Sequence, residues 1–191
     1  TVGAADTIAS ISGSGALRLN GALTMGTSTF SGNISGASAI LMNTGTLTFS
    51  GNNTNWSGGI TGSPMSGAVF IAGADNAFGT GTIARGTNPT VTTIRSSDAT
   101  DRTLSNSFTR ASGGGGGLIF GSAGTGNLTI QGGYSSTNDM ALVGIQVDNA
   151  WTQINGVVAS SDSSRTFTKT GTGTLILNGN NTYTLATTIS A

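Results

Sequence analysis

The sequence predicts an all-β protein, a right-handed parallel β-helix (β-solenoid) that forms a single elongated domain over residues 1–191. Three observations predict it. Apolar and polar residues alternate in short segments, glycine, serine or asparagine corners follow every few residues, and a seven-residue motif recurs four times. Alternation with a period of two is typical of a strand with one buried face. Strands this short suit a chain that coils on itself, so that inward side chains of successive coils stack.

The recurring motif is Gly-x-Leu-x-Φ-x-Gly, where Φ is Leu, Phe or Ile. Its copies occupy residues 15–21, 45–51, 126–132 and 173–179. In each copy we expect the two apolar residues to point inward: Leu17 and Leu19, Leu47 and Phe49, Leu128 and Ile130, and Leu175 and Leu177. The second and fourth copies continue into an asparagine pair, an aromatic residue (Trp56 or Tyr183) and another short strand. The repeat is therefore a strand, an asparagine corner, an aromatic position and a second strand.

The chain between these copies is rich in Val, Ile, Thr and Phe, as strands prefer. The further strands are expected within Ala68–Ala72, Thr80–Arg85, Thr90–Arg95, Thr103–Thr109, Leu118–Phe120, Met140–Val147 and Asn155–Ala159. No segment combines a 3.6-residue apolar period with helix caps, so essentially no helix is expected. Coils of about 20–25 residues would give roughly eight or nine rungs, and corner asparagines would form ladders along the axis. A β-sandwich is the alternative, but it would need longer strands and regular hairpin signals.

Composition restricts the partners. Seven basic and seven acidic residues give a net charge of zero, and no Lys/Arg cluster could displace the counterions of a nucleic acid, so none is expected to bind. The densest charged group, Arg95, Asp98, Asp101, Arg102 and Arg110, mixes both signs and is expected to be a solvated loop or strand edge. No apolar run approaches the roughly 20 residues of a spanning helix, so membrane insertion is not expected.

The residue types of most catalytic sites are missing. The chain has no His, no Cys and no Glu, which excludes Ser-His-Asp and Cys-His arrangements and the usual zinc sites. Asp98 and Asp101 are the one close carboxylate pair, and residues three apart on a strand would face opposite sides. The five-glycine run, Gly113–Gly117, is expected to be an extended loop, because no helix or lysine follows to bind phosphate. We therefore predict no enzyme, no cofactor and no catalytic, cofactor-binding or metal site.

Four aromatic residues could in principle stack on a sugar: Trp56, Tyr134, Trp151 and Tyr183. Isolated aromatic residues on a solenoid more often fill the corner of a coil. No glycan site is assigned from the sequence.

Residues 168–189 resemble a known family. They follow the approximate pattern K-x-G-x-G-T-L-x-L-x-G-x-N-T-Y-x-G-x-T-x-I of the autotransporter-associated β-strand repeat, also called the passenger-associated transport repeat. Leu185 stands near the place of the glycine that normally follows the tyrosine. The matching residues are Lys169, Gly171, Gly173, Thr174, Leu175, Leu177, Gly179, Asn181, Thr182, Tyr183, Thr187 and Ile189. Residues 76–83 and 102–109 resemble elements between such repeats. The resemblance implies a parallel β-helix in a large bacterial surface protein, often a passenger of type V secretion, where such repeats are thought to assist transport and folding.

These observations predict a non-enzymatic structural solenoid that is extracellular or on the bacterial cell surface. Neither end shows an evident polar cap, and residues 187–191 end the chain in a repeat strand. Because open solenoid ends offer unpaired strand edges, copies are expected to join end to end as a homopolymer, giving a filament. The alternative is a monomeric adhesin or passenger segment that binds glycan or another surface. Thr1 is not a methionine, so the chain is expected to be a processed product or a fragment.

Overall fold

The computed structural model describes residues 1–62, 65–86, 91–110, 116–136, 144–160, 166–184 and 186–190. Every regular element in these ranges is a β-strand, and every strand pair is parallel. The predicted all-β solenoid is confirmed, and the sandwich alternative is wrong because its hairpins would pair antiparallel. Within the described ranges there is no helix that could span a membrane.

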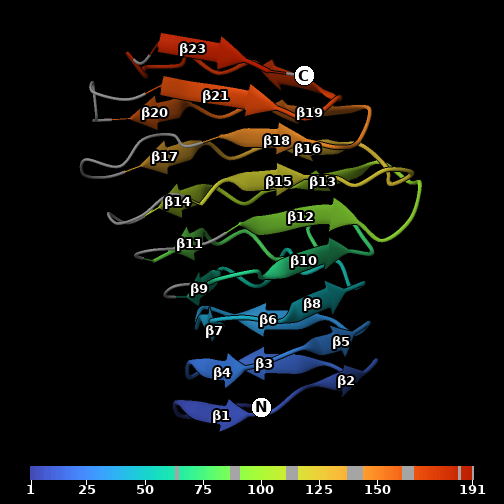
Figure 1. Ribbon diagram of the computed structural model, residues 1–191. Helices are drawn as coiled ribbons and strands as arrows, with labels where there is room; N and C mark the ends of the chain where they lie inside the picture. Colours follow the sequence, from blue (N-terminus) through green and yellow to red (C-terminus); the bar gives the residue numbers. More distant parts are fainter. Residues whose placement is uncertain are drawn as a thin grey trace.

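The strands stack coil upon coil, from β1 at one end to β23 at the other (Figure 1). The first sheet has eight strands: β1 (Asp6–Ile8), β4 (Leu23–Met25), β7 (Ile40–Leu41), β9 (Ile60–Gly62), β11 (Ile83–Arg85), β14 (Phe108–Arg110), β17 (Tyr134–Ser136) and β20 (Val158–Ser160). The second sheet has nine: β2 (Ser12–Gly13), β5 (Ser28–Phe30), β8 (Thr46–Phe49), β10 (Val69–Ala72), β12 (Thr92–Ser96), β15 (Leu118–Phe120), β18 (Ile145–Val147), β21 (Thr166–Thr170) and β23 (Ala186–Ile189).

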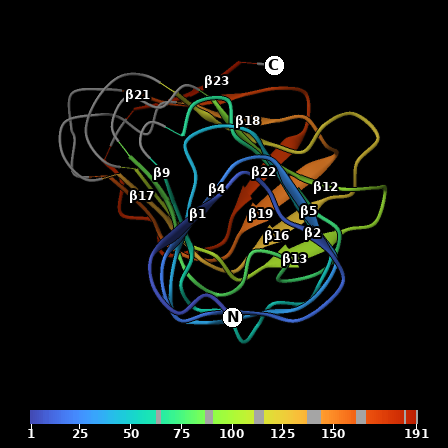
Figure 2. The same ribbon diagram turned by 90° about the horizontal axis from the view of Figure 1, so that it is seen from below.

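The third face is made of two short sheets with irregular chain between them. One sheet pairs β3 (Leu17–Leu19) with β6 (Ile34–Gly36), and the other stacks β13 (Arg102–Leu104), β16 (Leu128–Ile130), β19 (Trp151–Ile154) and β22 (Thr174–Leu177). The chain between them keeps the stack continuous through a bridge from Gly36 to Trp56 and backbone hydrogen bonds that link Asn53, Asn76 and Thr103. Seen along the stack, the three faces enclose one interior (Figure 2).

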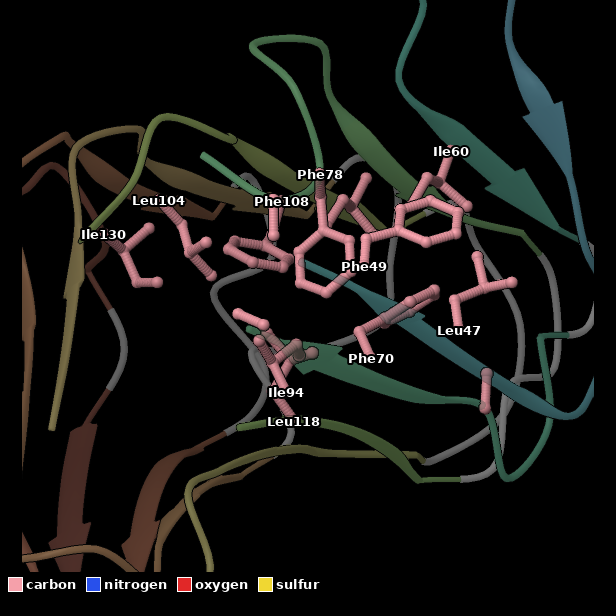
Figure 3. Packing of buried hydrophobic residues seen from close by; sticks show 14 of the residues in the cluster. Leu47, Phe49, Ile60, Phe70, Phe78, Ile94, Leu104, Phe108, Leu118 and Ile130 are labelled. Atoms are coloured by element: carbon pink, nitrogen blue, oxygen red, sulfur yellow. The ribbon is translucent and has the colours of Figure 1, made fainter. Parts of the chain in front are cut away.

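Inward side chains fill that interior in columns. Parallel register places Leu47, Phe70, Ile94 and Phe120 on successive strands of the second sheet, and all four are almost fully buried. Aromatic rings connect the faces: Phe108 of the first sheet meets Phe120 edge-on at 5.7 Å. Figure 3 shows Phe49, Phe70, Phe78 and Phe108 packed within one apolar cluster. The alternation seen in the sequence therefore sets the core, because every second residue of a strand points inward.

The corners of the coil differ in how constant they are. Three residues always separate the strands β13, β16 and β19 of the third face from the first-sheet strand that follows: 105–107, 131–133 and 155–157. A Cβ atom on Gly132 would lie 2.3 Å from the carbonyl oxygen of Asn106, so the close stacking of coils at this corner requires glycine.

The other corners vary in length. The length of a coil is the number of residues between two paired positions on successive strands of one sheet. In the second sheet this length is small from Ser12 to its partner Thr29 and much larger from Leu118 to its partner Ile145. The coil shortens again at the end of the chain, where Phe167 pairs with Thr187. The coils are thus longer in the middle of the solenoid than at either end, not uniform as assumed from the sequence.

The four copies of the motif do not lie on one face of the solenoid. The copy of the motif at 45–51 contains β8, a strand of the second sheet, whereas the other three copies contain β3, β16 and β22 on the third face. Any strand between glycine corners has the same local pattern, so the motif identifies a strand but not its face. The segment Thr103–Thr109, expected as one strand, contains the corner between β13 and β14, where the buried side chain of Asn106 turns the chain. The turns that the sequence predicts at Pro64 and Pro89 lie outside the described residues, as do Met140 and Gly113–Gly115.

Candidate functional site: interior polar groups and the open end faces

The aromatic residues proposed as sugar-stacking candidates differ in exposure. Trp56 is fully buried, its indole N–H donates to the carbonyl oxygen of Ser38 at 2.9 Å, and its ring meets Phe49 edge-on at 6.4 Å. Tyr134 is also buried. Trp56 therefore fills a coil corner, as expected. Tyr183 is half-buried against the ring of Phe167 at 5.2 Å. Trp151, at an outward position of β19, is partly exposed.

Buried asparagine side chains join successive coils. The side-chain oxygen of Asn53 accepts a hydrogen bond from the backbone N–H of Ile34 at 2.7 Å, and its amide nitrogen donates to the carbonyl oxygen of Ala77 at 2.6 Å. Asn53 thus links the coil before it to the coil after it. Asn106 donates to the carbonyl oxygens of Phe78 and Gly81, which both lie on the coil before it.

The predicted amide ladder is confirmed on the outside of the corner that follows the third face. The amide nitrogen of Asn155 donates to the side-chain oxygen of Gln131 at 2.9 Å, and that of Asn178 donates to the side-chain oxygen of Asn155 at 3.1 Å. Each coil therefore donates to the coil before it, and the direction of the ladder follows the direction of the chain.

Two arginines in the interior were not foreseen. Arg110, expected in a solvated charged group, is fully buried, and Arg85 beside it on β11 is 1% exposed. Both occupy inward positions, two residues after Ile83 and Phe108, so the period-two alternation could have located them. Arg85 donates to the hydroxyl of Thr92 and to the carbonyl oxygens of Gly116 and Gly117, each at 3.0 Å. The carbonyl oxygens of the last two glycines of the five-glycine run thus accept hydrogen bonds from a cationic side chain. In an anion-binding nest, by contrast, backbone N–H groups donate to an anion.

Tyr134 lies on β17, next to β14, with the two guanidinium groups nearby. Burial raises the pKa of the Tyr134 phenol, while the positive charges of Arg85 and Arg110 act in the opposite direction. Burial also lowers the pKa of Arg85. The net raised pKa shows that the folded chain favours the neutral phenol.

Stability should therefore fall in alkali. The unfolded chain loses the Tyr134 proton near pH 10, whereas the folded chain retains it to higher pH, so the free energy of unfolding decreases as pH rises past about 10. Tyr134→Phe should weaken that decrease, and Tyr183→Phe, which leaves the buried phenol in place, should retain it. Urea unfolding at a series of pH values from 8 to 11 measures both. An identical pH dependence in wild type and Tyr134→Phe would contradict the assignment.

Asp98 and Asp101 have structural partners. They lie in the corner between β12 and β13 rather than within one strand, so the expected opposite strand faces do not apply. Asp98 accepts from the backbone N–H of Thr100 and forms an ion pair with Arg102 at 3.2 Å. Its pKa is lowered, first by hydrogen bonds from Thr100 and then by Arg102. Asp101 accepts from the backbone and side chain of Asn127 on the next coil. In the described part of the chain no three His, Cys, Asp or Glu side chains gather to hold a metal ion.

The C-terminal end face carries exposed apolar residues. All four residues of β23 are exposed, and Ile189 retains 74% of its accessible surface. Beneath it Leu175 and Leu177 of β22 are half-buried and pack on the core. A cleft of about 260 Å³ opens here, lined by Lys169, Gly173, Thr174, Leu175 and Ile189. At the other end Val2, Ile8, Ile11 and Leu17 are likewise only partly covered.

Residues 167–191 match the family model described as Passenger-associated-transport-repeat. No curated protein and no solved structure matches the chain. The matched segment includes β22, β23 and all of β21 except Thr166, and residues of these strands line the end cleft. The match and the solenoid fold together fit an autotransporter-associated repeat protein.

Proposed function

We propose that the chain is a non-enzymatic structural solenoid of a bacterial cell surface or extracellular fibre, and that its copies associate end to end through the open terminal coils. The passenger repeat and the fold point to a structural, passenger-like domain and to a secreted or surface location. The observation that carries the self-association is the C-terminal end face, where β23 has one paired edge, on β21, and four exposed residues.

The end face has the properties of a joining surface. A terminal strand offers N–H and C=O groups in the spacing that another parallel strand requires. A further coil stacked on this end would cover half-buried Leu175 and Leu177 and exposed Ile189. Their apolar surface would then be removed from water, which favours association. The net charge of zero gives no long-range repulsion between copies. Because the two ends differ, the contact is heterologous and builds an open filament.

The assembly is tested with the 1–191 chain itself. As concentration rises, light scattering should detect growing particles, and electron microscopy should show filaments. Ile189→Lys should suppress them by placing a charge on the end face. Val91→Lys is the matched control, because Val91 is 40% exposed immediately before β12, in the middle of the stack and away from both ends (Figure 1). Dispersed monomers of the wild-type chain at high concentration would contradict the proposal.

The second candidate is a monomeric adhesin or passenger segment. The partly exposed ring of Trp151 favours it, because an outward aromatic side chain can stack on a sugar. Binding on a glycan array that is lost in Trp151→Ala, with the chain still monomeric, would support this function over end-to-end association.

A further inference from the structure

The outward side of the third face carries an array of polar side chains beside one aromatic ring. Backbone pairing aligns Thr129 of β16 with Thr103 of β13 and with Gln153 of β19. Trp151 lies two residues before Gln153, and Asn155 lies two residues after it. Alternate residues of a strand point to the same side, so these side chains share the outward side. The three strands lie over one another along the stack (Figure 2).

A chain of amide hydrogen bonds fixes the orientation of this array. The side-chain nitrogen of Gln153 donates to the side-chain oxygen of Asn155 at 2.7 Å, and the side-chain nitrogen of Asn155 donates to the side-chain oxygen of Gln131 at 2.9 Å. Within the part of the chain that the structure describes, the network leaves the side-chain oxygen of Gln153 as a free acceptor and the side-chain nitrogen of Gln131 as a free donor. Side chains that already hold one another lose little further conformational entropy when a ligand binds.

We propose that the outward side of β16 and β19 binds a neutral oligosaccharide, with one sugar ring on the indole of Trp151 and hydroxyls of the adjoining sugar on Gln153 and Gln131. The inference rests on the second candidate function, an adhesin segment, and names the site and the class of ligand.

The residue types fit a sugar. A pyranose has an apolar face of C–H groups that packs on an aromatic ring, and hydroxyls that each donate and accept hydrogen bonds. The partly exposed ring of Trp151 provides the platform. Gln153 lies about 7 Å further along the strand, within reach of the sugar next to the one on the ring. Thr129, opposite Gln153 and two residues before Gln131, adds a hydroxyl between the free acceptor and the free donor.

The charge near this array favours a neutral ligand. Asp101 accepts from the backbone and side chain of Asn127 at 2.7 and 3.1 Å, and the side-chain oxygen of Asn127 accepts from the backbone N–H of Trp151 at 2.9 Å. The Asp101 carboxylate therefore lies two strands from Trp151, about 10 Å away. Arg102, beside it, is paired with Asp98 at 3.2 Å. One cation for two carboxylates leaves a net negative charge, which repels a uronic or sialic acid.

Fluorescence titration of the 1–191 chain tests for binding, because the chain has two tryptophans and Trp56 is fully buried, so that a ligand on the surface reaches Trp151. The probes are cellohexaose, maltohexaose, xylohexaose and mannohexaose. At least one should shift the emission to shorter wavelength and saturate. The same oligosaccharide oxidised to a uronic acid at one C6 should bind about two- to fivefold more weakly. Asp101→Asn should remove that difference.

Calorimetric titration of variants locates the site. Trp151→Ala should weaken binding about tenfold or more, and Trp151→Phe, which keeps a ring, should retain most of it. Gln153→Ala and Gln131→Ala should each weaken binding about three- to tenfold. Gln146→Ala is the matched control and should bind as wild type does. Gln146 is also an outward glutamine held by a hydrogen bond, to Asp148 at 2.8 Å, but it lies on the second sheet.

The outcomes separate the site from the function on which it rests. Binding that persists unchanged in Trp151→Ala and in both third-face glutamine variants would overturn the site and leave the adhesin function in place. A wild-type chain that binds none of the four probes would also overturn the site. If the glycan array is empty as well, the adhesin function is overturned with it.

Discussion

Trp56→Ala should lower the free energy of unfolding by about 3–5 kcal/mol, the usual cost of truncating a buried tryptophan. The ring is fully buried and packs edge-on against Phe49, and its N–H holds the carbonyl oxygen of Ser38. Truncation would leave a cavity between coils and an unsatisfied carbonyl group. Urea-induced unfolding followed by circular dichroism gives the change.

Trp151→Ala is the matched control for Trp56. The same residue type is removed from an outward, partly exposed position of β19, so its loss should cost much less. Equal losses at the two positions would contradict the view that Trp56 acts as a corner filler of the core.

Asn53→Ala should cost about 2–6 kcal/mol, because it leaves two buried backbone groups unsatisfied at about 1–3 kcal/mol each. Those groups are the N–H of Ile34 and the carbonyl oxygen of Ala77, one coil before and one coil after Asn53. The loss should therefore appear in both neighbouring coils. Hydrogen exchange should quicken at the Ile34 amide together with the fall in the midpoint of urea unfolding.

Asn52→Ala provides the control for that substitution. Asn52 precedes Asn53 in the same corner but is exposed, and exposed substitutions usually change stability by no more than about 0.5 kcal/mol. An equal loss in the free energy of unfolding for both variants would show that the interior hydrogen bonds of Asn53 do not stabilise the corner.

The core of this fold can be predicted from the sequence because each strand of a solenoid has one face toward the interior and one face toward solvent. Period-two alternation places Leu47 and Phe49 inward without knowledge of their neighbours, and both are fully buried. The same rule would have placed Arg85 and Arg110 inward, but charged side chains are expected outside, and this expectation gave a wrong location for Arg110. The alternation was the stronger signal, because the backbone fixes side-chain direction before burial selects residue type.

The face on which a strand lies could not be obtained from local pattern. The motif copies at 45–51 and 173–179 are followed by the same Asn-Asn-Thr corner, yet β8 and β22 belong to different faces. The side-chain oxygen of Asn53 accordingly accepts a hydrogen bond from the backbone N–H of Ile34 on the third face. The side-chain oxygen of Asn181 instead accepts from the backbone N–H of Val158 in the first sheet at 2.8 Å. Which face a corner serves depends on the lengths of the coils below it, and those lengths are not constant along the chain.

The corner of constant length after the third face has a consequence for how such a chain can diverge. It forms an edge along which successive coils contact each other through glycine backbone, as at Gly132, and no residue can be added there without displacing every coil above it. The corners elsewhere have already absorbed additions of several residues while strand pairing stayed in register. Insertions, epitope tags and grafted domains should therefore be tolerated at the variable corners and rejected along the glycine edge, so that one side of the rod is free to vary while the other keeps its axial spacing.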